Sequence, residues 1–551
     1  MKKVLPILIL LISCSNPNLK LDKIKDIASP ISSDKKKTEI KNWYHQDIES
    51  DSVPGISLIR AYDQILKYKK GEPVVVAVID MPIDIHHEDL KNNIWINEDE
   101  ILGNNIDDDD NGYIDDVNGW NFLGNKDRIT KMFVNYEYTR ILKKYDSIFK
   151  DTAAIGNDSL KFQIYQLANR KYQNQLEFAR EDSAYIDMVS NAKKNAKNYF
   201  KKYFKDNREI TISIIDSLKS IYPNDTTMIG QAKILSNFYN YGFTDDYIKD
   251  YELKASERLS KLLNKNYNDR EITGDNGDDL EDTNYGNNQV NSEVGFFNHG
   301  TIMAGLIAAE RQNKIGADGF SNNIKIMSLP ISAFGHEHDK DIALAIRYAV
   351  NNGAKVINMS IGKEFSMYKE WVFEALKYAE EKNVLIVSGG GNSSYDLDTY
   401  NHYYPNDNEK NNEEVSKNFI KVGASTNEPN KKLVASFSNY GKNDIDIFAP
   451  GISGFSTSSN LSTKYEVVDG GSSMSAALVS GIAALLYSYY PNLNVKQIKD
   501  IILESGVQYN FEVQQPSTDD SGKMVSFDSL SKSGKVVNAY NALLMAEEIS
   551  N

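Results

Sequence analysis

The chain has 551 residues, which is too long for one compact core of ordinary size and indicates two domains or one large domain with insertions. Its 62 basic and 77 acidic side chains give a net charge of −15, which disfavours nucleic acid and anionic lipid surfaces as electrostatic partners. The single cysteine excludes an intramolecular disulfide and a multi-cysteine metal site.

The first 42 residues have the composition of an export signal followed by a tether. Residues 1–13 begin with Lys2 and Lys3 and continue with an apolar stretch too short to span a membrane stably. Together with Cys14 they resemble a bacterial lipoprotein signal, which implies cleavage before Cys14, lipid attachment to it and an exported protein anchored in the cell envelope. An ordinary signal peptide is the alternative. Residues 14–42 are rich in Lys, Ser and Asp, which predicts an unfolded tether.

Globular composition begins at about Trp43, and apolar runs then alternate with helical patterns. The run "EPVVVAVID" is typical of a strand buried on both faces and ends at Asp80. "NIKIMSLPI", "AKVINMSIG", "NVLIVSGGGN" and "FIKVGAS" also predict strands, and "DIALAIRYAVNNGA" and "EWVFEALKYAEEK" predict helices between them. This alternation predicts an α/β fold with a parallel sheet flanked by helices. Functional residues should gather beyond the carboxyl ends of the strands, where Asp80, Gly362 and Asn392 fall.

A long segment interrupts this alternation of predicted strands and helices. Residues 128–285 are rich in Lys, Tyr, Asp and Asn, and stretches such as "LKFQIYQLANRKYQNQLEFA" have helical spacing. We predict a mainly helical insertion there, within a main domain formed by residues 43–127 and 286–551. Two interpretations of this insertion are open. It is either a solvated outgrowth without its own function or a segment with a role in substrate access.

The serine cluster at residues 470–481 could supply a nucleophile, but a hydroxyl needs a base and the base needs an orienting carboxylate. Among the seven histidines, His299 differs because it precedes Gly300 and Thr301 at the start of a small-residue helix. A core histidine is the alternative for that position. His336 and His338 could bind metal but lack a partner set, so a solvated loop is favoured. Surface loops are also predicted for the remaining histidines, His45, His86, His87 and His402.

Four segments in chain order strengthen the assignment of His299. Asp80 ends a buried strand, His299 starts a helix, Asn392 follows "SGGG" and the serines precede the last long apolar helix. The order Asp, His, Ser is that of subtilisin and differs from chymotrypsin and the α/β-hydrolases. "VVVAVIDMPIDIHHEDL", "NHGTIMAGLIAA", "INMSIG", "VSGGGN" and "GGSSMSAALVSGIAALL" resemble the linked motifs of the subtilisin-like serine peptidases, the S8 or subtilase family.

The resemblance implies a role for each matching position. It makes Ser473 the nucleophile, His299 the general base and Asp80 the residue that orients His299. Asn392 would bind the oxyanion, and substrate would pair with Ser360, Ile361, Gly362 and Gly391. The implied protein is a monomeric, lipid-anchored serine endopeptidase that acts on polypeptides through an acyl-enzyme and needs no cofactor for its chemistry.

Three positions depart from the family pattern. Pro82 follows the aspartate where the family has glycine, Ile302 replaces a second histidine, and Ala477 replaces the proline after the serine. These departures leave a second hypothesis, a catalytically degenerate relative that binds peptides at the cell envelope.

The stretch "IDDDDNGYIDD" raises the question of a metal ion. Asp107, Asp109, Asn111 and Asp115 have the spacing of an oxygen-ligand calcium loop, although no glutamate follows at the twelfth place. Two interpretations of this stretch are open: it binds a structural calcium ion, or it is an acidic, solvated turn.

Overall fold

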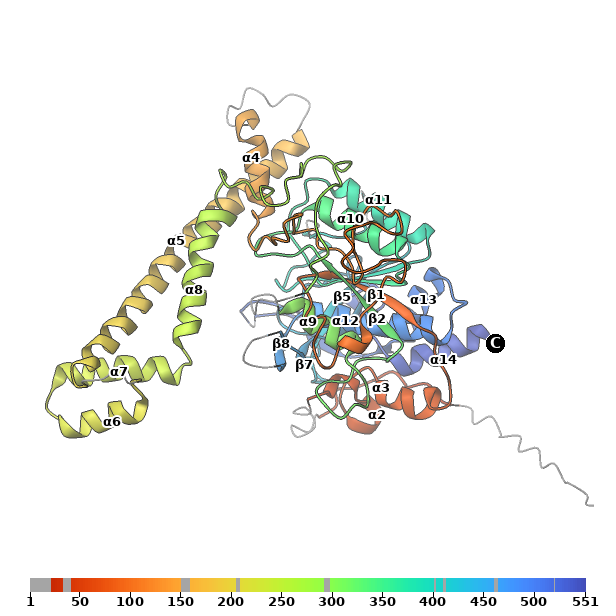
Figure 1. The fold of residues 1–551 in the computed structure, drawn as a ribbon. Coiled ribbons are helices and arrows are strands. Elements are labelled where there is room, and N and C mark those ends of the chain that lie inside the picture. The colour runs from red at the N-terminus through yellow and green to blue at the C-terminus, as the bar shows by residue number, and fades with distance from the viewer. Residues whose placement is uncertain are drawn as a thin grey trace, which may run out of the picture.

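The computed structural model describes residues 21–32, 41–149, 159–204, 209–291, 298–400, 403–409, 413–459, 464–519 and 521–551. Cys14 and the signal pattern of residues 1–13 lie outside these ranges. An eight-stranded sheet crosses the body of the protein (Figure 1). Its strands in spatial order are β2 (Ile324–Pro330), β1 (Val74–Asp80), β3 (Val356–Met359), β4 (Leu385–Gly389), β5 (Phe419–Ser425), β6 (Ile447–Pro450), β12 (Lys535–Val536) and β9 (Val507–Gln508).

Neighbouring strands run parallel from β2 to β12, and β9 pairs antiparallel with β12 at the edge. The predicted parallel α/β sheet is therefore confirmed. Two hairpins complete the strands, β7 (Ile452–Thr457) with β8 (Tyr465–Gly470) and β10 (Glu512–Gln514) with β11 (Met524–Ser526).

Helices cover both faces of the sheet because its strands carry apolar side chains on both sides. Val76 and Val78 face the layer of α9 (His299–Ala308), α12 (Ser472–Tyr489), α13 (Val495–Ser505) and α14 (Ala539–Ser550). Ala77 and Ile79 face α10 (Asp339–Asn351) and α11 (Lys369–Glu381). Alternate residues thus enter opposite cores, as the period of two requires.

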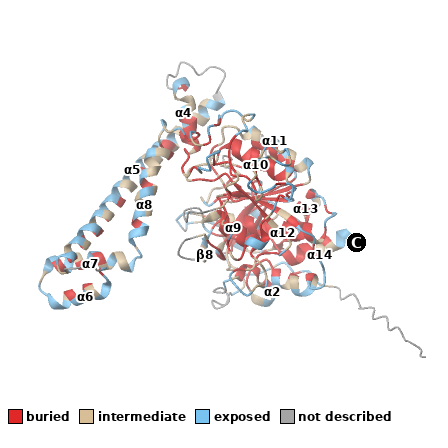
Figure 2. Ribbon diagram, in the orientation of Figure 1, coloured by how far each residue is buried: buried red, intermediate tan, exposed pale blue. Residues whose placement is uncertain are grey.

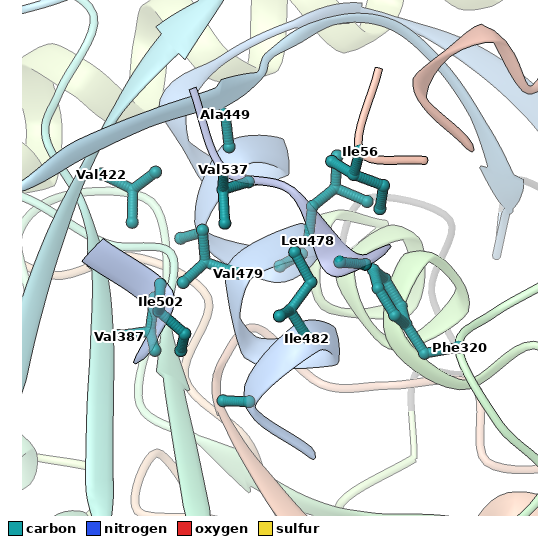
Figure 3. Packing of buried hydrophobic residues seen from close by; sticks show 14 of the residues in the cluster. Ile56, Phe320, Val387, Val422, Ala449, Leu478, Val479, Ile482, Ile502 and Val537 are labelled. Carbon is teal, nitrogen blue, oxygen red and sulfur yellow. The ribbon is translucent and has the colours of Figure 1, made fainter. Parts of the chain in front are cut away.

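The helix α12 is the centre of the larger core. Leu478, Val479 and Ile482 pack among side chains from several strands and helices (Figure 3). Burial of each such aliphatic side chain contributes about 1.5–3 kcal/mol to stability. Within the described part of the chain, α12 is the one helix long and apolar enough to cross a membrane, yet 89% of it is buried in the protein.

A helical arm leaves the body of the protein (Figure 1). We use this name for residues 137–262, within the segment predicted as an insertion. The arm contains α4 (Glu137–Phe149), α5 (Ser159–Lys201), α6 (Ile212–Ile221), α7 (Thr226–Asn240), α8 (Asp245–Glu257) and the π-helical turn η5 (Arg258–Leu262). Its helices are mostly exposed along their length, whereas α4 is largely buried at the base (Figure 2).

The remaining helices are short and lie near the amino-terminal part of the body or in connections. They are η1 (Trp43–His45), α2 (Ile48–Asp51), α3 (Leu58–Ala61), η2 (Tyr62–Leu66), η3 (Lys91–Asn93) and η7 (Phe527–Leu530).

The described part of the predicted tether, residues 21–32, is not free. Ile24 is 3% exposed, and its amide donates to Asn541 Oδ1 over 2.9 Å. Ile27 forms a bridge with Tyr509, and the Ile31 amide donates to a carbonyl of the body. The prediction of an unfolded tether is wrong for these residues because isolated isoleucines with irregular spacing still find apolar contacts.

Candidate active site

Asp80 and His299 meet at the carboxyl end of β1. Asp80 is the last residue of that strand and its side chain is 1% exposed. His299 Nδ1 lies 2.7 Å from Asp80 Oδ1 and 2.9 Å from Oδ2. The Met81 amide donates to Oδ1 over 2.7 Å and fixes the carboxylate. Nδ1 must therefore carry the proton that Asp80 accepts, which leaves Nε2 of the neutral ring free to act as a base.

The charge of Asp80 also changes the acidity of the imidazole. Burial by itself lowers the pKa of His299, but the charge of Asp80, the hydrogen bond to Asp80 and the charge of Glu337 together raise it above its ordinary value. The side chain keeps 36% exposure, so Asp80 is enclosed while the ring remains accessible from solvent. This combination suits a general base that a substrate can reach from solvent.

Small residues let α9 bring His299 to this position. A Cβ on Gly300 would lie 2.2 Å from the Met81 carbonyl oxygen, so only glycine allows the helix to approach the loop after β1. The Asp84 amide donates to Thr301 Oγ1 over 2.9 Å and ties this loop to the helix. The Gly-Thr pair after the histidine is thus explained by close packing.

Ser473 lies in the first turn of α12, and Ser360 follows β3. The Ser473 hydroxyl donates to the Ser360 carbonyl oxygen over 3.3 Å, and the Ser360 hydroxyl donates to the Ser473 carbonyl oxygen over 3.1 Å. Among the described residues, no hydrogen bond joins Ser473 Oγ to His299. In ligand-free active sites the bond between nucleophile and base is often long or poorly aligned.

Asn392 is held beside the start of α12. The Ser472 amide donates to Asn392 Oδ1 over 2.8 Å, so the Nδ2 group, a donor, points elsewhere. The Gly391 amide donates to Ser472 Oγ over 2.9 Å. Ser472 therefore links the loop that carries Asn392 to the helix that carries Ser473, a role that sequence reasoning missed.

The predicted substrate-binding positions Gly362 and Gly391 both lie against Tyr403. A Cβ on Gly362 would lie 2.4 Å from the Tyr403 hydroxyl oxygen, and one on Gly391 would lie 2.5 Å from its ring. Gly391 also has φ +102°, which favours glycine. Sequence reasoning missed Tyr403 because no motif surrounds it.

The three departures from the family pattern lie in the protein interior. Pro82 is buried, Ile302 is 6% exposed and Ala477 is fully buried. Ile302 and Ala477 belong to the larger hydrophobic core. They do not introduce a polar or charged group beside Asp80 or His299.

The acidic loop gathers a different set of carboxylates from the predicted one. Glu100, Asp109 and Asp116 each offer an oxygen, and these atoms lie within 4.8 Å of one another. Asp107 and Asp115 instead accept backbone amides, Asp107 from Asn111 and Gly112 and Asp115 from residues 103–105. Asn111 donates its side-chain amide to Asp109 and Asp116. Of the four predicted ligands, only Asp109 belongs to the carboxylate cluster.

The donor set of this cluster fits a hard cation. Glu100 Oε2 is buried without a hydrogen-bond partner, while Oε1 accepts the amides of Asp108 and Asp109. Burial raises the pKa of Glu100 and of Asp116, and neighbouring carboxylates raise both further. Carboxylate oxygens are ligands that Ca²⁺ prefers, and the side-chain amides of Asn97 and Asn111 hold Asp109 and Asp116 in place by donating to them.

Several histidines that the sequence places in surface loops are buried. His45, His87 and His338 are 3%, 4% and 8% exposed, so the prediction is wrong for them. His338 Nε2 lies 3.0 Å from Asp269 Oδ2, and His336 Nδ1 accepts the Glu137 amide. The partners come from distant segments, which local composition does not reveal. His86 is exposed as predicted, and His402 lies outside the described residues.

Comparisons with known proteins identify the family of the chain. The sequence profile described as "Subtilase family" matches residues 71–526. A thermophilic serine proteinase of Bacillus sp. (strain AK1) is 30% identical over 58% of this chain and 69% of its own length. Subtilisin DY of Bacillus licheniformis is 32% identical over 37% of this chain and 68% of its own. A chain of the subtilase cytotoxin SubAB has a TM-score of 0.38 and 24% identity, covering 47% of this chain and 79% of that one.

Proposed function

Because the chain belongs to the subtilase family of serine peptidases, we propose that it is an endopeptidase in which Asp80, His299 and Ser473 form a catalytic triad. The observation that carries the proposal is the pair of contacts, 2.7 and 2.9 Å, between His299 Nδ1 and the buried carboxylate of Asp80. The interior location of Pro82, Ile302 and Ala477 gives no support to a degenerate binding protein.

In the proposed reaction, Ser473 Oγ attacks the carbonyl carbon of the scissile peptide bond. His299 Nε2 takes the hydroxyl proton, and Asp80 stabilises the imidazolium that forms. Collapse of the tetrahedral intermediate breaks the C–N bond, and His299 gives its proton to the leaving amine. Water, deprotonated by His299, then attacks the acyl-enzyme and releases the acid product while Ser473 regains its proton.

The negative oxygen of each tetrahedral intermediate needs hydrogen-bond donors that are already in place. Asn392 Nδ2 and the Ser473 amide would supply them, because Oδ1 of Asn392 is occupied by the Ser472 amide. The amino-terminal end of α12 adds a favourable helix dipole. Substrate backbone would pair with Ser360 to Gly362 and with Gly391, as in strand addition to a sheet edge.

Labelling with a fluorophosphonate tests the proposal directly, because the reagent phosphonylates a serine that a neighbouring base activates. We expect one adduct, which peptide mass mapping places on Ser473. An intact protein that cleaves casein but carries the adduct on another serine would contradict the triad, and one that neither cleaves nor reacts would contradict the peptidase function.

We expect Asn392→Ala to lower kcat about 100-fold to 1,000-fold with little change in KM, since a transition-state hydrogen bond is lost. The exposed position of Asn392 lets water satisfy the Ser472 amide, so the fold should persist. Steady-state kinetics on a chromogenic peptide measure the effect, with Ser393→Ala as the control. An increase in KM at unchanged kcat would make Asn392 a substrate-binding residue instead.

We also propose a structural calcium site formed by Glu100, Asp109 and Asp116, supported by the clustered carboxylates and the unpaired oxygen of Glu100. Calcium at 100 times its dissociation constant should stabilise the fold by about 2.7 kcal/mol. The melting temperature should then rise by a few degrees with calcium and fall with a chelator. Asp116→Asn should abolish this response, whereas the exposed Asp110→Asn should retain it. An unchanged melting temperature in the wild type would contradict the site.

Export and lipid attachment at Cys14 remain part of the proposal, supported by the signal pattern of residues 1–14. The lipid would tether a monomeric enzyme to the cell envelope. Mass analysis of the mature amino-terminus distinguishes lipidated Cys14 from a free terminus.

A further inference from the structure

The segment that follows the substrate-binding positions is fixed by ion pairs. We call residues 363–368 the exit segment, because the chain leaves the Ser360–Gly362 stretch through it. Lys363 is 2% exposed, and its backbone N–H and C=O pair with Tyr404 over 2.8 Å each. Its ammonium lies 2.8 Å from Asp339 Oδ1 and 3.3 Å from Glu137 Oε2.

Glu137 belongs to the arm and contacts the exit segment at Lys363 and at Met367. It lies in the first turn of α4 and is 2% exposed. Besides the ion pair with Lys363, its Oε1 accepts the Met367 amide over 3.0 Å. Burial by itself raises the pKa of Glu137, but the charges of Arg140 and Lys363 lower it to about 2, so the carboxylate is ionised.

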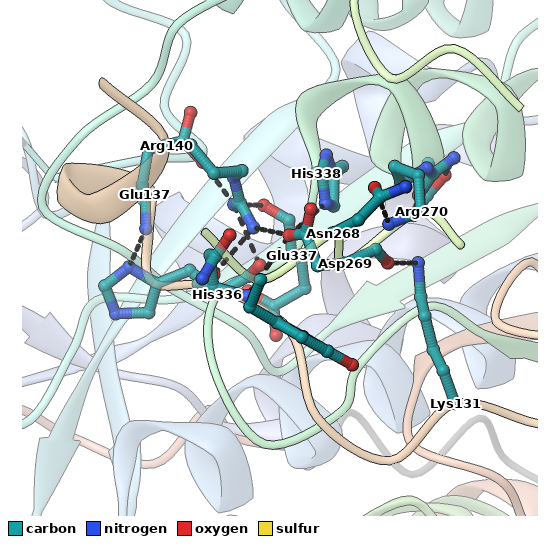
Figure 4. Close-up of polar contacts among 12 residues, drawn as sticks. Lys131, Glu137, Arg140, Asn268, Asp269, Arg270, His336, Glu337 and His338 are labelled. Atoms are coloured by element: carbon teal, nitrogen blue, oxygen red, sulfur yellow. Dashed lines mark hydrogen bonds and ion pairs between the residues drawn. The ribbon is translucent and has the colours of Figure 1, made fainter. Parts of the chain in front are cut away.

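Arg140, one turn further along α4, completes the connection. It donates to Glu137 Oε2 from Nε over 3.0 Å and to the carbonyl oxygens of His336 and Glu337 over 2.9 and 3.0 Å. Figure 4 shows these groups converging at the base of the arm. The Lys363 ammonium donates to the same Glu337 carbonyl oxygen over 2.7 Å. The arm and the exit segment thus share one buried network.

Apolar and peripheral contacts also join the arm to the exit segment. Phe365 packs with Tyr138, Ile141 and Leu142 of α4. Lys171 of α5 lies 2.8 Å from Glu364 Oε1. The side chains of residues 363–365 in the exit segment therefore all contact the arm. An arm that was only an isolated, solvated outgrowth would not make these contacts.

The contacts between the arm and the exit segment lie close in sequence to the proposed active site. Ser360 exchanges two hydrogen bonds with Ser473, and Lys363 is the third residue after Ser360. A displacement of Lys363 would also displace the adjoining backbone of Ser360 to Gly362, which pairs with substrate in the proposed function. We propose that Glu137 is a positioning residue, through which the arm fixes the Ser360–Gly362 backbone for binding of extended substrates. This inference rests on the proposed peptidase function.

The test is Glu137→Gln, which removes the charge and nearly preserves the shape. We expect KM for a peptide that spans several residues on the acyl side of the scissile bond to rise about tenfold, the effect of one or two weakened hydrogen bonds. Hydrolysis of p-nitrophenyl acetate and the rate of fluorophosphonate labelling should stay within about twofold of wild type, because neither reagent pairs with the strand. Glu177→Gln, an exposed charge change on α5, is the matched control.

A second variant keeps the inference testable if Glu137→Gln does not fold. Lys363→Met leaves Glu137 paired with Arg140 and should give the same selective increase in KM. An unchanged KM in either folded variant would overturn the inference. Equal losses on the peptide, the ester and the labelling reaction would also overturn it, because they would indicate that the network supports the triad itself. Wild-type protein that cleaves no substrate and takes no label would instead contradict the peptidase function.

Discussion

Ser473→Ala is expected to lower kcat for peptide hydrolysis by about a millionfold, which leaves only the slow turnover that oxyanion stabilisation and binding can support. The Ser473 hydroxyl makes one described hydrogen bond, to the Ser360 carbonyl oxygen over 3.3 Å. Its removal therefore creates no large cavity and breaks no buried network. The melting temperature should change little, and activity on casein or a peptide library should fall to the background of the assay.

The matched control lies in the same serine cluster. Ser475 Oγ donates to the carbonyl oxygens of Ala449 and Pro450 over 3.0 and 3.2 Å, at the end of β6. Ser475→Ala should cost about 1 kcal/mol of stability and leave kcat unchanged. Wild-type turnover in Ser473→Ala, or loss of turnover in a folded Ser475→Ala, would assign the nucleophile to another serine.

The sheet and the central pair of the site could be predicted because their determinants are local. A β-branched run such as residues 74–80 indicates a buried strand, and its last residue must lie at the functional edge of a parallel sheet. The family motifs then associate Asp80 with His299, 219 residues apart, and the structure places them in contact. The hydrogen bond from Ser473 to the Ser360 carbonyl oxygen is seen only in the structure, because no sequence pattern joins these two residues.

The ionic contacts could not be predicted, because each depends on partners that no local pattern connects. Lys363 and Glu137 are 226 residues apart, and neither belongs to a recognised motif. The acidic loop illustrates the same limit at short range. Its spacing indicates oxygen ligands, but only the folded loop shows that Asp115 binds backbone amides while Glu100 joins the carboxylate cluster.

Asp80→Asn is expected to lower kcat/KM about 10,000-fold because it favours the wrong tautomer of His299. The Met81 amide donates to Oδ1 of Asp80 and would keep the asparagine carbonyl oxygen at that place. The asparagine Nδ2 group would then replace Oδ2, which lies 2.9 Å from His299 Nδ1. This N–H donor competes for Nδ1 with the carbonyl oxygen, which stays at the position of Oδ1, 2.7 Å from Nδ1. In the ring form that the donor stabilises, Nδ1 is unprotonated, so Nε2 carries the proton and cannot accept one from Ser473.

The same variant should shift the pH profile in a defined direction. His299 must be neutral to act as the base, so activity rises as pH increases through its pKa, which Asp80 raises in the wild type. Without the charge of Asp80 the pKa of His299 falls, so the acidic limb of the kcat/KM profile should move to lower pH. The maximum value of kcat/KM should be far below that of the wild type. Asp84→Asn, on the same loop, should move neither the limb nor the maximum. A folded Asp80→Asn variant with an unshifted acidic limb and less than a tenfold loss would show that Asp80 does not orient His299, because both effects arise from the same carboxylate contact.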